Sequence, residues 1–429
     1  MHKKITTDIG NVKEPLWSLF AYKELLSHSV ADDTKSLKIV SLFSGCGGLD
    51  LGFTGNFKFR DKYYNKNEYS IIFSNDIDPA ATLVYNSNSK FLQHPIVKDD
   101  IRNISEQDIP DFDFLIAGFP CQPFSNAGLR KGVDDYRGTL FQDTIKILEY
   151  GLGQKSKPIG FLFENVRGIM STKMPNGTLV PDEIVKRTEK LGYKTNYKLI
   201  QSSEYGVPSN RFRLIIIGIR EDIGYFDYNT LYDVVEKFDI PNIRQNPYDL
   251  YLGSVLCDIP ENSAQRNDFW AYSPSGQYMV EKIGICSDGK TQLEKFKKRE
   301  PIELMSPTIS TGRSWKNMNY QDMSERFRKI FNDPQKYHSP NFYRRFALGE
   351  INGTITASAQ PENCGITHPF ENRRFTIREI ARIQSFPDNF VFPYKKIADA
   401  YKVIGNAVPP ILGWVLAKSL TEFLKQRCK

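Results

Sequence analysis

Short apolar runs, most of them ending at a glycine or an acidic residue, alternate with amphipathic stretches along the first half of the chain. Apolar runs of about 4–8 residues bounded by turn residues are typical of buried strands, whereas a spacing near 3.6 residues is typical of helices. Strands are expected at 37–43, 69–75, 113–117 and 159–163, and an extended apolar segment at 214–219. A helix is expected at 139–150. This alternation predicts an α/β fold with a doubly wound sheet.

The alternation stops at about residue 221, and the chain remains rich in loops until about residue 371. Aromatic and Asn residues in polar surroundings are frequent there, which is typical of a segment that recognises a ligand through loops. Helical periodicity returns at 373–384, and the last element is an apolar helix that ends near Leu424. We therefore expect three parts, namely an N-terminal extension at 1–36, a main domain at 37–220 plus 372–429, and a recognition domain at 221–371.

The composition of the 429 residues, with 40% hydrophobic and 25% charged residues, is that of an ordinary soluble protein. No run of about 18 apolar residues occurs and the N-terminus lacks an apolar signal core, so we expect a cytoplasmic protein without a membrane span. The cysteines stand apart, at positions 46, 121, 257, 286, 364 and 428. Because they form no Cys-x-x-Cys pair and the five histidines are equally dispersed, neither a disulfide framework nor a metal site is expected.

The net charge of +7 is concentrated near the C-terminus. Residues 372–429 contain eleven Lys and Arg against four Asp and Glu, so the rest of the chain is close to neutral. A basic segment beside a neutral body suits a phosphate-lined partner. A solvated helix face explains the same pattern equally well, and the charge alone does not separate the two interpretations.

Residues 118–128, Gly-Phe-Pro-Cys-Gln-Pro-Phe-Ser-Asn-Ala-Gly, follow the strand expected at 113–117. Prolines on both sides disfavour helical geometry, so Cys121 is expected on a stiff turn beyond a strand end, where open α/β sheets build their active sites. A lone cysteine is more often a small buried hydrophobe. The two prolines and the polar residues that follow favour a nucleophile instead. The stretch 129–138 has no apolar periodicity and is expected to be a loop that folds over a substrate.

Glycines or acidic residues also follow the first three expected strands. The turn after the first strand contains Gly45, Gly47 and Gly48. These glycines allow backbone N–H groups to approach a ligand, but Asp50 breaks the dinucleotide fingerprint, so a pyrophosphate is not expected. Asp76 follows the second strand and Asp100 stands at a third acidic end. One acidic residue alone is more often a helix cap, but together they predict a site for an adenosine-containing cofactor.

Charged residues also accompany the later extended segments. Glu164 follows the strand at 159–163, close to the turn that carries Cys121, and is a candidate acid. A capping or surface glutamate is an equally good interpretation of this residue without further context. Arg211 and Arg213 share one face of an extended segment because side chains alternate with a period of two.

Five motifs together give the chain a resemblance to a known family. They are Phe-Ser-Gly-Cys-Gly-Gly at 43–48, Gly-Phe-Pro-Cys-Gln-Pro-Phe-Ser at 118–125, Glu-Asn-Val at 164–166, Arg-Phe-Arg at 211–213 and Gly-Asn-Ala-Val-Pro at 405–409. In this order they resemble the DNA cytosine-5 methyltransferases of the bacterial restriction–modification type, over residues 38–220 and 372–424. The resemblance implies a Rossmann-like domain with a doubly wound mixed sheet, S-adenosylmethionine as cofactor, double-stranded DNA as partner, and a target-recognition domain at 221–371. It also implies that the C-terminal helix packs beside the first strand.

The resemblance implies a role for each matching residue. Cys121 would be the nucleophile, Glu164 the acid that protonates N3, and Arg211 and Arg213 would bind the base carbonyl and nearby backbone. The cofactor would lie across Phe43, Gly45, Gly47, Gly48, Asp76, Ile77, Asp100, Ile101, Asn406 and Val408. Two departures are visible. Ser209 stands where the family often has Gln, and Ile77 stands where an aromatic residue is common, which suggests a weaker adenine stack.

Three rival functions have different sequence signatures. A tRNA-acting relative would have a shorter insert and a Cys-Phe-Thr signature, which is absent from this sequence. A DNA-binding relative without catalysis is disfavoured because nucleophile, acid and arginines are all present, and an NAD-dependent dehydrogenase is disfavoured by Asp50. The sequence leaves the target site open. We expect a short palindrome read by a monomer, and a cognate restriction endonuclease is a possible partner.

Overall fold

The computed structural model describes residues 36–120, 140–285, 288–301, 312–333, 335, 341–358, 360 and 365–427. The expectations for residues 1–35, for Cys121 and for the loop at 129–138 lie outside these ranges.

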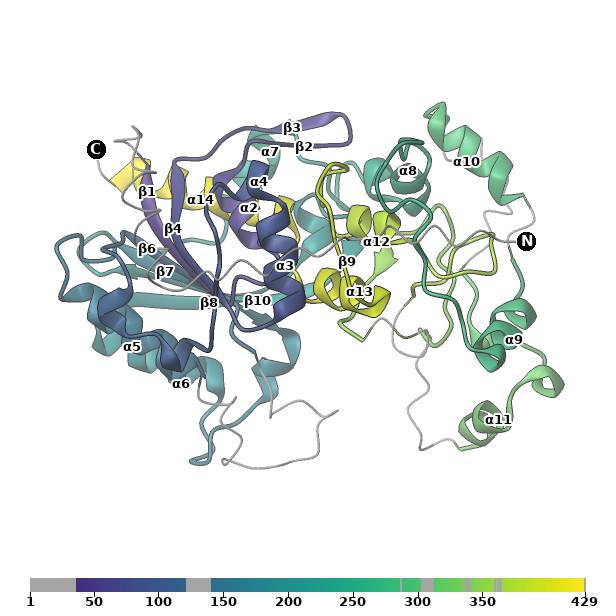
Figure 1. The fold of residues 1–429 in the computed structure, drawn as a ribbon, viewed down its shortest axis with the longest axis horizontal. Helices are drawn as coiled ribbons and strands as arrows, with labels where there is room; N and C mark the ends of the chain where they lie inside the picture. The colour runs from purple at the N-terminus through teal and green to yellow at the C-terminus, as the bar shows by residue number, and fades with distance from the viewer. Residues whose placement is uncertain are drawn as a thin grey trace. The chain divides into compact units, whose positions relative to one another are not determined.

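A seven-stranded sheet forms the centre of the fold (Figure 1). In spatial order its strands are β5 (Val97–Lys98), β4 (Tyr69–Asp76), β1 (Leu37–Leu42), β6 (Phe114–Ala117), β7 (Gly160–Val166), β10 (Phe212–Arg220) and β8 (Tyr193–Gln201). Neighbouring strands are parallel from β5 to β7, and β10 runs antiparallel to both β7 and β8. The chain order reverses beside β1, which makes the carboxyl ends of β1 and β6 the topological switch point.

Five of the seven strands of this sheet form at the expected apolar runs, whereas β5 and β8 contain no such run and were not predicted. Residues Leu214–Ile217 of β10 are fully buried, because helices cover both faces of the sheet. The strand expected at 159–163 continues to Val166, so Glu164 lies inside β7 rather than after its end. The helix expected at 139–150 is α5 (Leu140–Leu152). The predicted doubly wound mixed sheet is confirmed.

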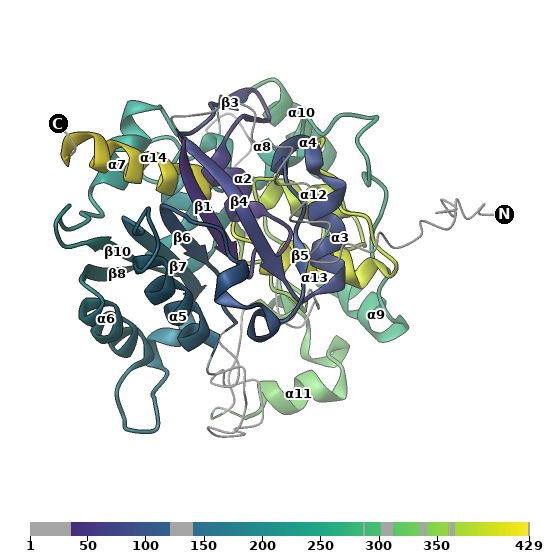
Figure 2. The ribbon, with the colours of Figure 1, turned by 60° about the vertical axis from the view of Figure 1, so that its left-hand side comes forward.

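Helices cover the two faces of the sheet unequally (Figures 1 and 2). On one side lie α5 and α6 (Val180–Lys190), and on the other lie α2 (Gly48–Thr54), α7 (Thr230–Lys237) and α14 (Pro410–Arg427). The C-terminal helix α14 packs chiefly on α2 and α7. Packing of this helix beside the first strand itself stays a prediction.

A hairpin of two short strands, β2 (Phe57–Phe59) and β3 (Lys62–Tyr64), follows α2 and was not predicted. Each strand has only three residues, too few to show a period-two pattern. The hairpin is held by its side chains. The ring of Tyr64 stacks on Phe57 at 5.0 Å and meets the edge of Trp414 in α14 at 5.3 Å.

The basic segment at 373–384 forms α12 (Ile377–Ile383), and both sequence interpretations of its charge are wrong for its arginines. Arg378 and Arg382 are 0% and 1% exposed, so they line neither a partner surface nor a solvated face. Arg382 bonds to Asp388 at 2.6 and 2.7 Å and pairs with Asp258. Arg378 donates to backbone carbonyls, those of Ala264, Pro387 and Phe390.

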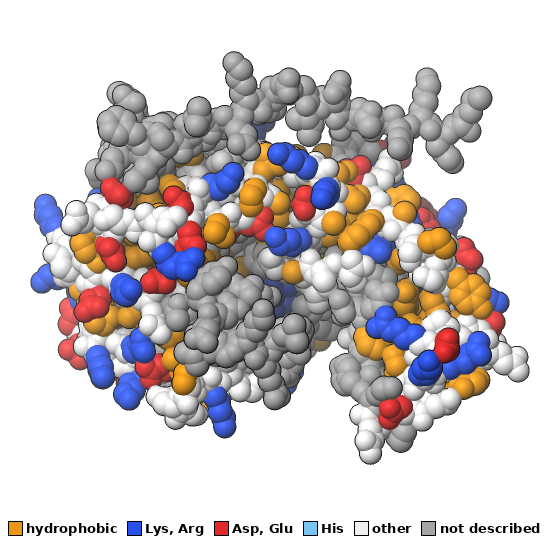
Figure 3. Space-filling model, turned by 60° about the horizontal axis from the view of Figure 1, so that its bottom comes forward, with side chains coloured by type: hydrophobic (Ala, Val, Ile, Leu, Met, Phe, Trp, Pro, Cys, Tyr) orange, Lys and Arg blue, Asp and Glu red, His pale blue; other side chains and the backbone are white. Residues whose placement is uncertain are grey.

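Surface charge among the described residues is mixed in sign. On the face shown in Figure 3, Lys and Arg side chains alternate with Asp and Glu side chains instead of gathering in one area. Several exposed charges of the protein form pairs within one helix, such as Lys329 with Glu325 at 2.7 Å. A net charge of +7 is therefore a poor guide to the binding surface here, since part of it lies in the interior.

The segment at 221–371 contains α7, α8 (Leu252–Leu256), α9 (Pro274–Ile283), α10 (Gly289–Lys297), α11 (Glu325–Phe331) and β11 (Asn352–Gly353). A second apolar cluster lies within it, formed by Met279, Val280, Ile283, Trp315, Met318, Met323, Phe327 and Tyr343. Other parts of the segment join the main core, since α7 packs on α14 and β11 pairs with β9 (Ser209–Asn210). A recognition domain with these boundaries stays a prediction.

One stretch, Ile397–Gln426, is long and apolar enough to cross a membrane by length and composition alone. It contains α13 (Ile397–Asn406) and α14, and 89% of its most apolar window is buried inside the protein. Core helices of soluble proteins pass the same test, so this stretch is weak evidence for a membrane span.

Candidate active site

The glycine-rich turn follows β1 at the switch point of the sheet. Gly45 has a φ of 59°, which is the left-handed region that glycine adopts without strain. Its N–H donates to Asp76 Oδ2 at 2.8 Å, so the structure brings the first and second predicted strand ends together. A Cβ on Gly48 would overlap the carbonyl oxygen of Val408. The turn is therefore packed directly against the C-terminal motif.

Asp76 and Ile77 form the tip of β4. The Asp76 carboxylate also accepts from the N–H of Asp78 at 2.8 Å. Burial raises the pKa of Asp76, and the hydrogen bonds from Asp78 and Gly45 oppose that effect. Ile77 is 60% exposed, so its side chain is accessible beside the Asp76 carboxylate.

The remaining predicted cofactor residues differ in exposure. Asp100 caps a short helical turn and bonds to Arg102, which lowers the pKa of the Asp100 carboxyl. Ile101 is 4% exposed and belongs to the core. Asn406 is exposed at the end of α13, and Phe43 is half-buried with a φ of 54°. The residues around the turn thus offer an apolar surface at Ile77, a carboxylate at Asp76 and a close-packed backbone floor at Gly48.

Two of the predicted catalytic residues, Glu164 in β7 and Arg213 in β10, lie side by side. Glu164 Oε1 and Arg213 Nε lie 2.7 Å apart, and both side chains are buried. Burial lowers the pKa of Arg213, and the charge of Glu164 opposes that effect. A Cβ on Gly118 would lie 3.5 Å from Glu164 Oε2. The ion pair therefore faces the turn that leads to Cys121, whose own position lies outside the described residues.

Arg211 does not join this pair. Its guanidinium is fully buried and donates to the carbonyl oxygens of Ile355, Gly405 and Asn406. Burial and the nearby charge of Arg213 lower the pKa of Arg211 well below its ordinary value. The two arginines of the Arg-Phe-Arg motif thus have different surroundings, which their period-two spacing did not predict.

Asn165 was missed by the sequence reasoning. Its Nδ2 donates to the carbonyl oxygen of Phe119 at 2.9 Å, and its Oδ1 accepts from the N–H of Val166. This bond fixes the backbone two residues before Cys121 to the strand that carries Glu164. The Glu-Asn-Val motif contained the signal, since a buried amide beside a candidate acid needs a partner.

A chain of hydrogen bonds beneath the glycine-rich turn was also missed. Asp50 is 0% exposed and accepts from Ser41 Oγ at 2.6 Å and from the hydroxyl of Tyr85 at 2.8 Å. Tyr85 in turn lies 2.8 Å from His94 Nε2. Burial raises the pKa of Asp50 to about 6 and lowers the pKa of His94 to about 4.

These two shifts predict a measurable effect of Asp50→Asn. As pH falls from 6.5 towards 4, unfolded His94 binds a proton that the folded residue does not, which lowers stability. Folded Asp50 binds a proton below about pH 6 that unfolded Asp50 does not, which raises stability. Asp50→Asn removes only the second effect. As the pH falls, the free energy of unfolding of this variant should therefore decrease more steeply than that of the wild type, by about 1 kcal/mol per pH unit.

Urea unfolding at pH 4.5, 5.5 and 6.5 measures this difference. Asp61→Asn, at an exposed position on the β2–β3 hairpin, is the matched control and should follow the wild type. Parallel profiles for Asp50→Asn and the wild type would show that folded Asp50 holds no proton in this range.

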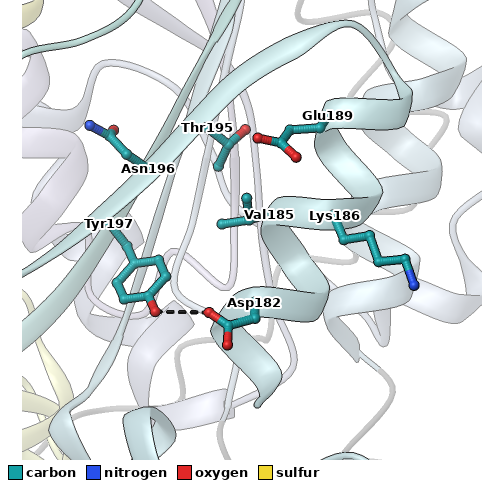
Figure 4. Close-up of a pocket in the computed structure, with 7 residues that line it drawn as sticks. All are labelled: Asp182, Val185, Lys186, Glu189, Thr195, Asn196 and Tyr197. Atoms are coloured by element: carbon teal, nitrogen blue, oxygen red, sulfur yellow. Dashed lines mark hydrogen bonds between the residues drawn. The ribbon is translucent and has the colours of Figure 1, made fainter. Parts of the chain in front are cut away.

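A separate pocket of about 400 Å³ lies between α6 and β8 (Figure 4). Its lining includes Asp182 and Tyr197, which are joined by a hydrogen bond of 2.9 Å. It lies at the edge strand of the sheet, and none of the described site residues lines it. The pocket is therefore distinct from the site at the strand ends.

The mixed sheet, the glycine-rich turn after β1 and the acidic tip of β4 define an S-adenosylmethionine-dependent methyltransferase of the Rossmann-like class. The chain belongs to the C-5 cytosine-specific DNA methylase family, whose profile matches residues 37–422. It is therefore a DNA cytosine-5 methyltransferase with S-adenosylmethionine as methyl donor and DNA as substrate.

Curated relatives and solved structures agree with this assignment. The chain is 29% identical to the Type II methyltransferase M.FnuDI of Fusobacterium nucleatum, with 92% of this chain and 96% of that protein covered. It is 30% identical to M.NgoPII of Neisseria gonorrhoeae, with 91% and 97% covered. The S. pombe Dnmt2 methyltransferase structure has 17% identity, a TM-score of 0.57 and coverage of 90% and 99%, which supports the fold.

Proposed function

We propose that this enzyme methylates one cytosine within a short duplex sequence through a covalent adduct of Cys121, and thereby protects host DNA from a cognate restriction endonuclease. The observation that carries the proposal is the buried Glu164–Arg213 ion pair, whose atoms lie 2.7 Å apart and face the turn leading to Cys121. A fixed acid beside a cysteine turn is the arrangement that addition to a pyrimidine ring requires.

The described residues at the strand ends fit S-adenosylmethionine. Asp76 would accept hydrogen bonds from the ribose hydroxyls, and the exposed Ile77 would cover one face of the adenine. Asp100 and Ile101 would meet the adenine edge, while Phe43 and the turn from Gly45 to Gly48 would lie along the cofactor. Asn406 and Val408 would lie at its methionine end. When bound there, the cofactor supplies an electrophilic methyl group on sulfur.

Carbon 5 of cytosine is too weakly nucleophilic to take that methyl group directly. The Cys121 thiolate forms a bond to carbon 6, and Glu164 protonates N3, so that carbon 5 becomes an enamine carbon. Carbon 5 then takes the methyl group as the bond between the methyl carbon and sulfur breaks, which leaves S-adenosylhomocysteine. Carbon 5 later loses its proton to a base. The bond between Cys121 Sγ and carbon 6 then breaks and N3 returns its proton to Glu164, which restores the aromatic ring, the acid and the thiolate. Arg213 would hold Glu164 in place and bind the base carbonyl.

The target carbon is hidden in a duplex, so the cytosine must leave the base stack, at a cost of a few kcal/mol. The loop at 129–138 would close over the flipped base. The segment 221–371 would read the target sequence, which we expect to be a short palindrome bound by a monomer in the cytoplasm. Type II relatives support a role in restriction–modification.

Bisulfite sequencing of plasmid DNA from cells that express the protein tests this proposal. Protected cytosines should recur in one short sequence on both strands, and should be absent with an empty vector. This outcome identifies the modified base and its site together. Unmodified DNA from cells with abundant soluble protein would contradict the proposal, and RNA from the same cells should then be sequenced for 5-methylcytosine.

A further inference from the structure

Arg211 is buried in a way that contact with a base does not explain. Its side chain is 0% exposed, and its Nη1 donates to the carbonyl oxygens of Ile355 and Gly405, both at 2.9 Å. Its Nη2 donates to the carbonyl oxygen of Asn406 at 3.3 Å. Burying a charge without an ionic partner is costly. A guanidinium is, however, a rigid planar fork that can hold several carbonyls in one fixed arrangement.

The three acceptors belong to two segments that are 144 to 195 residues away along the chain. Ile355 lies just after β11, which pairs with β9 immediately before Arg211. Gly405 and Asn406 end α13. These two segments touch, because a Cβ on Gly405 would overlap the carbonyl oxygen of Thr356. Arg211 therefore holds together a junction of three parts of the chain.

The junction lies close in sequence to two parts of the site, namely the segment that packs on the glycine-rich turn and the Glu164–Arg213 ion pair. Two residues beyond Asn406, the carbonyl oxygen of Val408 packs directly against Gly48. Two residues beyond Arg211, Arg213 pairs with Glu164 at 2.7 Å. A displacement of the junction would thus move the 405–408 segment, and the glycine-rich turn that packs on it, relative to Glu164.

We propose that Arg211 is a positioning residue that holds the 405–408 segment against the glycine-rich turn and thereby shapes the methionine end of the cofactor site. This role differs from the base contact that the family resemblance implied for Arg211. It rests on the proposed function in one respect, namely that the cofactor lies along Gly45–Gly48 and Asn406.

Calorimetric titration of the full chain with S-adenosylhomocysteine, without DNA, tests this inference. Arg211→Met should bind the probe at least about tenfold more weakly than the wild type, because the loss of bonds from a charged donor frees the 405–408 segment. Arg211→Lys keeps the charge and part of the bonding, and should recover part of the affinity. The KM for S-adenosylmethionine should rise in parallel.

Arg378 provides a matched control. It is also 0% exposed and donates to three backbone carbonyls, those of Ala264, Pro387 and Phe390. Arg378→Lys should lower the thermal midpoint as Arg211→Lys does, but the folded protein should bind S-adenosylhomocysteine like the wild type. Equal affinities for the folded wild type, Arg211→Lys and Arg378→Lys would overturn the inference.

A second variant disturbs the junction without touching Arg211. Gly405→Ala inserts a methyl group against the carbonyl oxygen of Thr356, and should also weaken binding of the probe. If the Arg211 variants do not fold, unchanged affinity in folded Gly405→Ala overturns the inference. Failure of the wild type itself to bind S-adenosylhomocysteine would instead contradict the proposed cofactor site.

Discussion

Replacement of Cys121 by alanine is expected to lower methyl transfer by roughly 10⁴–10⁶-fold, the scale on which enzymes fail when they lose a nucleophile. Without a thiolate at carbon 6, carbon 5 never gains enamine character. Transfer of a tritiated methyl group to a duplex that contains the bisulfite-defined site measures the loss. Duplex binding should persist, because recognition is expected to lie in the segment 221–371. Cys257→Ser, at a partly buried cysteine after α8, should retain full activity.

The covalent step has its own readout. A duplex with 5-fluorocytosine at the target should remain joined to the wild-type enzyme after methyl transfer, because fluorine cannot leave carbon 5 as the proton does. The complex should survive denaturation and be absent with Cys121→Ala. Full activity in Cys121→Ala, or a trapped complex that maps to another residue, would contradict the proposed nucleophile.

The sequence missed β8, whose mostly polar residues are only partly buried, but it predicted the five strands of the sheet that are buried apolar runs. β10 is the clearest example, with Leu214–Ile217 fully buried. The β2–β3 hairpin was missed for the opposite reason. Its strands are short, and they are held by contacts such as that between Tyr64 and Trp414, which are distant in sequence. Periodicity cannot reveal an element that tertiary packing stabilises.

Among the features of the sequence, the charge pattern was the least reliable guide to which residues lie on the surface. In α12, Arg378 and Arg382 belong to a basic and periodic sequence, which by itself indicates a solvated or anion-binding face. Their acceptors are the carboxylates of Asp388 and Asp258 together with backbone carbonyls, and both arginines are interior residues. The helical periodicity of α12 does not reveal these acceptors, although Asp388 follows Arg382 by only six residues.

The candidate site was predictable where its residues follow strands. Gly45 and Asp76 were expected at neighbouring strand ends, and the structure joins them by a hydrogen bond of 2.8 Å. Glu164 and Arg213 were named separately, but their pairing depends on the antiparallel register of β7 and β10. The roles of Asn165 and Arg211 depend on backbone carbonyls, which every residue has, so the sequence does not identify the partners of these two side chains.

The pairing of Glu164 with Arg213 predicts a large and non-additive effect on stability. Arg213→Met leaves the Glu164 carboxylate, 8% exposed, without the cation that lies 2.7 Å from it. Removal of one partner from a buried pair costs about 3–5 kcal/mol, mostly because the other charge stays buried and uncompensated. In a Glu164→Gln background no such charge remains, so the same substitution should cost much less.

A double-mutant cycle on the free energy of unfolding in urea measures this coupling. We expect Glu164→Gln/Arg213→Met to be more stable than Arg213→Met alone, although it contains one more substitution. Additive losses would show that the two groups do not form an ion pair in solution.

The cycle also separates the effect of Glu164 on stability from its effect on catalysis. Glu164→Gln keeps the shape of the side chain but removes the acid, so it should lower methyl transfer by about 10²–10⁴-fold even where its stability is close to that of the wild type.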